Sequence, residues 1–171
     1  MSFTVETGEG LPDANSYLSV ADADSYIADH GDSATWTAAS DASKEAALRL
    51  ATQYLDIRFG GKWLGVRSDS DQSLAWPRNG VDDYDGYVVD WDAVPAAIED
   101  ATAELALRVI DGDTLLDDID EPGTIKSESV TTGPITTKTE YLGGKSQVKR
   151  YPLIDGLIRP LISSGGMLER G

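Results

Sequence analysis

The sequence predicts a mainly α-helical protein: a small bundle of about three core helices with a long aromatic-pinned loop, a protruding β-hairpin and an extended C-terminal tail or helix. Three stretches carry apolar residues at steps of three and four, which places those residues on one face of a helix. Between residues 125 and 142 the pattern changes to the alternation typical of strands. The chain has 171 residues, 40% of them hydrophobic, which suffices for one domain and an appendage.

The first helix is expected to begin after Ser19. This residue and Asp22 fit a capping box, in which the serine hydroxyl accepts a hydrogen bond from a backbone N–H at the helix start. Apolar residues follow at helical spacing until Gly31, where the helix is expected to end. Turn-forming residues are frequent in residues 1–18, which predicts an extended arm before this helix.

The second helix is the strongest helical signal in the first half of the chain. Ser40 and Asp41 favour a helix start, and Gly60 and Gly61 end the run. One stripe of the helix is apolar: Ala47, Leu48, Ala51, Tyr54 and Leu55. A third helix of four or five turns is expected from Pro95 to just before Gly112.

A long irregular connection, residues 60–94, separates the second and third helices. It contains five large aromatic residues: Trp63, Trp76, Tyr84, Tyr87 and Trp91. Loops of this length inside a domain are usually functional or held down by large side chains. We therefore expect the aromatic residues to pin the connection onto the helices.

The last third of the chain predicts a hairpin and a weak helix. Two β-prone runs flank residues 131–134, but they carry little apolar surface, so the hairpin needs a neighbour to pair with. The apolar residues between 153 and 162 have helical spacing, which Gly156 and Pro160 weaken. We expect residues 124–142 and 145–162 to bind other subunits rather than to complete a core.

These elements define four expected segments. They are an N-terminal arm (1–18), a helical core domain (19–121), a β-hairpin with a basic linker (122–150) and a C-terminal interaction segment (151–171).

Charge is distributed unevenly along the chain. Residues 1–121 hold 26 acidic against 7 basic side chains, whereas residues 122–171 hold 4 against 7. Since affinity for the phosphate backbone comes from lysine and arginine, such a body is expected to repel nucleic acid. The chain shows neither a secretion signal nor an apolar run long enough for a membrane span, so no membrane association is expected.

Most chemistry that the sequence suggests is incomplete. Gly144-Lys145-Ser146 resembles the end of a phosphate-binding loop, but Thr139 stands where its first glycine belongs. Asp83-Tyr84-Asp85-Gly86 lacks both anchoring positions of a calcium loop. No cysteine is present, and the single histidine, His30, is expected to cap a helix or lie on the surface. We expect no enzyme activity, cofactor or metal.

The aromatic residues raise base stacking as an alternative role. Single-strand binders lay bases on aromatic rings that are interleaved with lysine and arginine. Here Lys62, Arg67 and Arg78 are offset by neighbouring aspartates. Core or interface packing is therefore the favoured interpretation.

Several motifs in residues 13–110 occur together in a specific order. They are Ala14-Asn-Ser-Tyr-Leu-Ser-Val-Ala-Asp-Ala-Asp-Ser-Tyr26, Trp36, Lys44-Glu-Ala-Ala-Leu-Arg-Leu-Ala-Thr-Gln-Tyr-Leu-Asp56, Leu74-Ala-Trp-Pro-Arg78 and Val94-Pro95. This combination resembles a family of tailed-bacteriophage proteins that are often labelled DnaT-like single-stranded DNA-binding proteins and are similar to head-to-tail connectors, or adaptors.

The resemblance implies a structural connector in the neck of the virion, assembled in the host cytoplasm. As a connector, the chain is expected to form a homo-oligomeric ring, commonly of twelve copies, that docks on the portal protein and joins the tail or a tail-terminator or stopper protein. Genomic DNA would pass through an acidic channel without specific binding. The alternative is a DnaT-like single-stranded DNA-binding replication protein.

The residues expected to contact other subunits or partners lie in the connection, the hairpin and the tail. They are Trp76, Arg78, Ile125, Val130, Ile135, Tyr141, Lys145, Lys149, Arg150, Tyr151, Leu157, Ile158 and Leu161. For Arg78 two alternatives stay open, an acid of an adjacent copy or an internal salt bridge. The basic residues at 145–150 would meet an acidic partner or DNA, or remain solvated.

Overall fold

The computed structural model describes residues 2–31, 33–116, 125–129, 138–141 and 149–163. The chain divides into two compact units. Unit 1 comprises Met1–Leu115 and Tyr151–Gly171, and unit 2 comprises Leu116–Arg150. The mainly helical class with a small antiparallel hairpin is confirmed.

Unit 1 is built on four helices that precede the hairpin in sequence. They are α1 (Val20–Asp29), α2 (Ala34–Ala38), α3 (Asp41–Phe59) and α4 (Ala96–Ile110). The predicted caps are present: the Ser19 hydroxyl accepts from the Asp22 N–H, and the Ser40 hydroxyl accepts from the Ser43 N–H. The three predicted helices are therefore confirmed with their starts.

The short helix α2 was not among the predicted elements. Its N-cap is Ser33, and it buries the Trp36 ring. The Trp36 indole N–H donates to the Asp24 carboxylate at 2.7 Å, and the Lys44 ammonium lies 2.8 Å from the same oxygen. One tryptophan, positioned by one turn of helix, thus joins α1 to α3.

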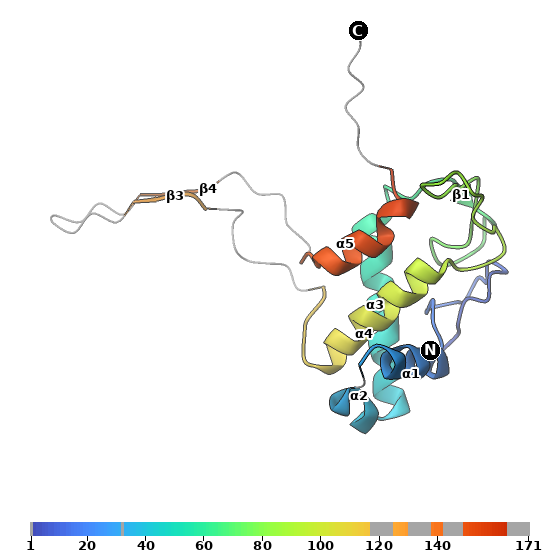
Figure 1. Ribbon diagram of the computed structural model, residues 1–171, viewed down its shortest axis with the longest axis horizontal. Coiled ribbons are helices and arrows are strands. Elements are labelled where there is room, and N and C mark those ends of the chain that lie inside the picture. Colours follow the sequence, from blue (N-terminus) through green and yellow to red (C-terminus); the bar gives the residue numbers. More distant parts are fainter. Residues whose placement is uncertain (1, 32, 117–124, 130–137, 142–148, 164–171) are drawn as a thin grey trace, which may run out of the picture. The chain divides into compact units, whose positions relative to one another are not determined.

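Helices α3 and α4 form the centre of unit 1 (Figure 1). Their facing side chains are fully buried, among them Leu48, Leu55, Ile98 and Leu105. Residues at steps of three, four and seven lie on one face of a helix, which is why the apolar stripes of the two sequences meet here.

The C-terminal segment belongs to the same core. Helix α5 (Pro152–Ile158) packs on α4, and the 3-10 turn η1 (Arg159–Leu161) follows it (Figure 1). Tyr151, Ile158 and Leu161 are buried, and the Leu64 N–H donates to the Leu161 carbonyl at 3.0 Å. The structure therefore corrects the expectation that this segment does not complete a core, because its apolar face has an intramolecular partner.

The N-terminal residues also pack onto the core instead of forming a separate arm. Val5 pairs with Ser16 in an isolated parallel bridge. The buried Glu6 carboxylate accepts hydrogen bonds from the N–H groups of Gly8, Gly10 and Leu11, each at 2.9 Å. These bonds fold residues 6–11 into a tight loop within unit 1.

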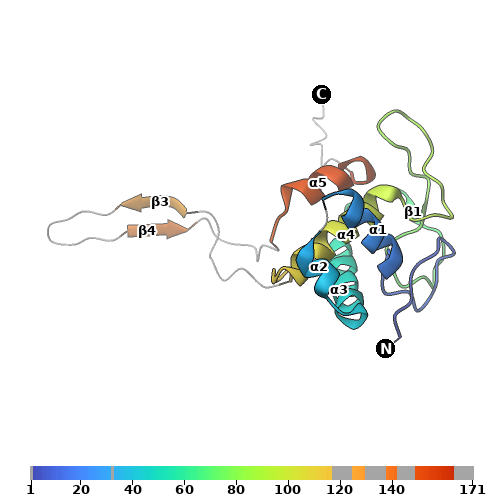
Figure 2. The ribbon, with the colours of Figure 1, turned by 60° about the horizontal axis from the view of Figure 1, so that its bottom comes forward.

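Unit 2 contains the predicted hairpin. Strand β3 (Ile125–Ser129) pairs antiparallel with β4 (Lys138–Tyr141), with a register irregularity between Ile125 and Ser127 (Figure 2). The predicted site residues Val130, Ile135 and Lys145 lie outside the described residues. Among the described residues, no helix is long and apolar enough to cross a membrane.

Candidate nucleic-acid interface

The connection between α3 and α4 has an inner part, residues 60–81, that is packed onto the helices. A short antiparallel ladder joins β1 (Val66–Arg67) to β2 (Arg78–Asn79). Trp63 and Trp76 are buried and meet edge to face, with ring centroids 5.8 Å apart. The prediction that aromatic side chains pin the connection is correct for these two residues.

Arg78 holds the inner part through backbone carbonyls. Its Nε donates to the Leu64 carbonyl at 2.6 Å, its Nη1 to the Ala75 carbonyl at 3.0 Å and its Nη2 to the Gly65 carbonyl at 2.7 Å. Among the described residues it forms no ion pair, so the internal salt bridge is not the role that it plays. Burial lowers the pKa of Arg78 from its usual value, and nearby Arg67 adds to this effect.

The outer part, residues 82–91, is here called the aromatic loop. Its side chains Tyr84, Tyr87 and Trp91 are 68%, 72% and 57% exposed. They therefore do not pin the connection, contrary to the prediction. Figure 2 shows the loop in green, extending from the side of unit 1 that carries β1.

Hydrogen bonds within the aromatic loop and at its base define its shape. The Asp83 carboxylate accepts from the Asp85 and Tyr87 N–H groups, both at 2.9 Å, and the Val89 N–H donates to the Val81 carbonyl. At the base, the Ser68 hydroxyl donates to the Trp91 carbonyl at 2.7 Å. The exposed rings are thus presented by a loop with its own hydrogen-bonded structure.

The charges around the aromatic loop have both signs. Four aspartates within the loop or directly after it are exposed: Asp82, Asp85, Asp90 and Asp92. Two exposed cations, Lys62 and Arg67, lie on the adjoining inner part, and Arg67 directly precedes the serine that bonds to Trp91. Among the described residues, no group of three or more acids and histidines could hold a metal ion.

A second surface feature is an open groove of about 480 Å³ beside α3, here called the α3 groove. Arg49, Gln53 and Ile57 line it from the helix, and Asn15 and Ser73 line it from the loops. Asp56 lies at its buried side, where its carboxylate accepts from the Tyr17 hydroxyl at 2.5 Å and the Ala75 N–H at 3.1 Å.

Burial shifts the pKa values of Asp56 and Tyr17, which are hydrogen-bonded to each other beside the α3 groove. Burial raises the pKa of Asp56, while the hydrogen bonds from Tyr17 and Ala75 oppose the rise. Burial, together with the Asp56 charge, raises the pKa of Tyr17 well above its usual value. The tyrosine is therefore a hydrogen-bond donor over the whole physiological range.

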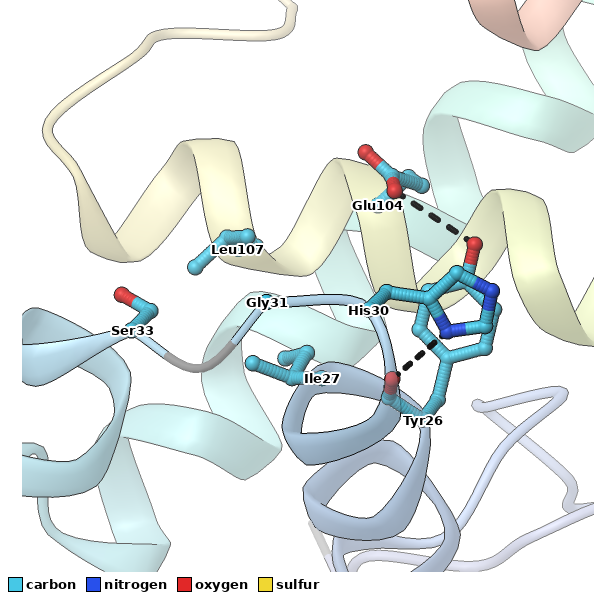
Figure 3. A pocket seen from close by; sticks show the side chains of 7 residues that line it. All are labelled: Tyr26, Ile27, His30, Gly31, Ser33, Glu104 and Leu107. Carbon is cyan, nitrogen blue, oxygen red and sulfur yellow. Dashed lines mark hydrogen bonds between the residues drawn. The ribbon is translucent and has the colours of Figure 1, made fainter.

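A third surface feature is a small pocket between the end of α1 and α4 (Figure 3). The His30 ring stacks on the Tyr26 ring at 4.0 Å, and its Nδ1 donates to the Tyr26 carbonyl. Burial and the acids Glu104 and Asp100 raise the pKa of Tyr26 to about 12. At about 90 Å³ the pocket is too small for a nucleotide, and His30 has the expected capping role.

The remaining predicted site residues do not gather into one site. Trp76 is buried in the core, and Leu157 is half-buried on α5. The Tyr151 hydroxyl donates to the Asp113 carboxylate at 3.1 Å. In unit 2, Ile125 pairs with Tyr141 across the strands. Lys149 and Arg150 are the last two residues of unit 2.

Reasoning from the sequence missed two features of this surface. The exposure of the aromatic loop has a sequence signal, because its rings alternate with aspartates that must stay solvated. The α3 groove has none, since its walls come from segments separated by up to sixty residues.

The comparisons with known proteins identify a family. The family described as "Putative DnaT-like ssDNA binding protein" matches residues 1–171. No curated protein and no solved structure matches the chain.

This match overturns the expected connector function. It supports the alternative, single-stranded DNA binding, and it lends no support to a virion neck protein, to portal or tail partners, or to DNA that passes without binding. The connector expectation relied on the net charge, which averages over the whole surface and does not describe local sites. Over its whole length, the chain belongs to the family of DnaT-like single-stranded DNA-binding proteins.

Proposed function

We propose that this protein binds single-stranded DNA and that bases stack on the aromatic loop. The observation that carries the proposal is the exposure of Tyr84, Tyr87 and Trp91 on one short loop. Large exposed aromatic clusters are uncommon on soluble proteins and mark interaction sites. Stacking contributes about 1–3 kcal/mol per base and tolerates any sequence.

The charges around the loop determine which nucleic acid fits. Exposed aspartates repel phosphates, so binding depends on the faces of unpaired bases, with Lys62 and Arg67 as exposed cations on the adjoining inner part. A duplex hides its base faces and presents a dense row of phosphates. The protein therefore prefers single strands, and phosphate contacts at Lys62 and Arg67 contribute only about −1.4 to the salt slope.

Tryptophan fluorescence tests this proposal directly. Trp36, Trp63 and Trp76 are buried, so quenching by an added oligonucleotide reports on Trp91. An oligothymidylate of about 15 nucleotides should quench the emission. A strand of equal length with abasic sugars should quench far less, because it keeps the phosphates and lacks the bases. Equal quenching by both strands would contradict stacking.

Substitutions in the aromatic loop give an independent test. Trp91→Ala and Tyr87→Ala should each weaken binding of the oligothymidylate about 5- to 150-fold, as loss of one stacked base implies. The matched control is Leu153→Ala, which truncates an exposed apolar side chain on α5. Fluorescence anisotropy of a labelled strand measures all three variants. Wild-type affinity in both loop variants would overturn the proposal.

A further inference from the structure

We propose that the α3 groove is a second contact site for the same DNA strand, in which Arg49 holds a phosphate and the groove accepts the adjoining nucleotide. This inference rests on the proposed function and adds a site that the family description does not name.

The Arg49 guanidinium is held by one long ion pair and one ring contact. It lies 5.6 Å from the centre of the Phe3 ring, and its nearest carboxylate, that of Glu45, is 3.8 Å away. By contrast, Arg58 lies 3.1 Å from the Asp155 carboxylate, and Arg78 donates to three carbonyls. A guanidinium that lines an open groove and is bound only loosely can make bidentate contact with a phosphate.

The α3 groove suits a nucleotide in size and lining. Its volume of about 480 Å³ falls within the range of pockets for small ligands. Ile57, 55% exposed, and Leu74 provide apolar surface for a base or sugar. Gln53 and Asn15 carry amides that can hydrogen-bond to base edges.

The N-terminal loop connects the α3 groove to the aromatic loop. At Gly8 a Cβ atom would lie 1.9 Å from the Asp92 carbonyl oxygen, so this glycine touches the base of the aromatic loop. At the other end, the Ser73 hydroxyl donates to the Ala14 carbonyl at 2.6 Å, and both residues line the groove. Six residue steps separate Gly8 from Ala14 and span at most about 22 Å, so the base of the aromatic loop and the edge of the groove lie within that distance of each other.

The test compares the salt dependence of three variants with that of the wild-type protein. Arg49→Gln should weaken oligothymidylate binding about 2- to 5-fold at low salt and make the salt slope shallower by about 0.7, as loss of one phosphate contact requires. Trp91→Ala should lower affinity without changing the slope. Arg159→Gln, an exposed arginine outside both surfaces, should change neither.

The outcomes separate this inference from the proposed function. Wild-type affinity and slope in Arg49→Gln would overturn the groove site, while quenching of Trp91 would still support stacking. A second variant, Gln53→Trp, fills the groove and should weaken binding while unfolding at the wild-type urea midpoint. Unchanged binding in Gln53→Trp would also count against the groove. If the wild-type protein fails to bind the strand, both proposals fall.

Discussion

The inner part of the α3–α4 connection and the aromatic loop both carry large aromatic side chains, but only the inner part buries them. Residues 60–81 hold two aromatic residues, four glycines and two aspartates, whereas residues 82–91 hold three aromatic residues, one glycine and four aspartates. In residues 60–81 the rings of Trp63 and Trp76 are buried, whereas in residues 82–91 every aromatic ring is more than half exposed. The difference therefore does not come from the aromatic residues themselves.

Hydrogen bonding of the backbone accounts for the difference. In the inner part, the buried Gln72 side chain donates to the carbonyls of Leu74 and Pro77 and accepts from the Asp69 N–H. Together with Arg78, it satisfies the polar groups that burial would otherwise leave unpaired. The aromatic loop has carboxylates instead, which keep it in water. An irregular segment is thus buried where neighbouring side chains satisfy its backbone.

The largest expected effect contrasts two tryptophans. Trp76→Ala should lower the free energy of unfolding by about 3–5 kcal/mol, because it removes a fully buried ring from the core. Trp91→Ala should change it by less than about 0.5 kcal/mol. Urea denaturation followed by circular dichroism measures both. Similar losses in the two variants would show that the aromatic loop is part of the core.

The next effect concerns two neighbouring arginines in β1 and β2. Arg78→Lys should lower the free energy of unfolding by about 1–3 kcal/mol. One ammonium group cannot replace a guanidinium that donates to three carbonyls. Arg67→Lys is the matched control, because Arg67 makes one such bond, to the Gln72 carbonyl. Urea midpoints of the two variants give the comparison. A larger loss in Arg67→Lys would contradict the assigned role of Arg78.

A smaller effect is expected in the pH dependence of stability. Because burial raises the pKa of Asp56, the unfolded chain ionises at this position first, near its usual pKa of about 3.9. The wild-type protein should lose stability relative to Asp56→Asn as pH rises from that value through the folded-state pKa. Urea midpoints of both proteins between about pH 4 and 7 test this. A relative gain of wild-type stability over this window would imply a lowered pKa.

The smallest effect is local to the aromatic loop. Asp83→Ala removes the carboxylate that accepts from the Asp85 and Tyr87 N–H groups. Hydrogen exchange at these two amides should become faster, while global stability changes by less than about 0.5 kcal/mol. Asp83→Asn keeps one acceptor oxygen, so its exchange rates at these two amides should lie between those of the wild-type protein and Asp83→Ala. Unchanged exchange in Asp83→Ala would show that the backbone alone shapes the loop.

The helical part of the fold was predictable because its signals are local. The Ser19 and Ser40 caps, the glycines after the helices and the apolar stripes all act within a few residues, and the structure has each of them. The hairpin was predictable for the same reason. Helix α2 was missed because five residues are too few to show a periodicity.

The candidate interface was less predictable. The sequence contains the tryptophans and tyrosines, but their number does not say which are buried. The inner rings are covered only because Gln72 and Arg78 satisfy the backbone around them. The α3 groove has no continuous sequence signature at all, because Asn15, Arg49 and Ser73 come from three separate segments.

By itself, the sequence determined where the main helices begin and end, since capping and periodicity depend on near neighbours along the chain. Only the tertiary structure decided that Tyr151 to Leu161 complete the core and that Tyr84 to Trp91 do not join it. Both outcomes depend on partners far apart in sequence, as in the hydrogen bond between Leu64 and Leu161. Burial is decided by whether a segment finds apolar contacts and hydrogen-bond partners in three dimensions.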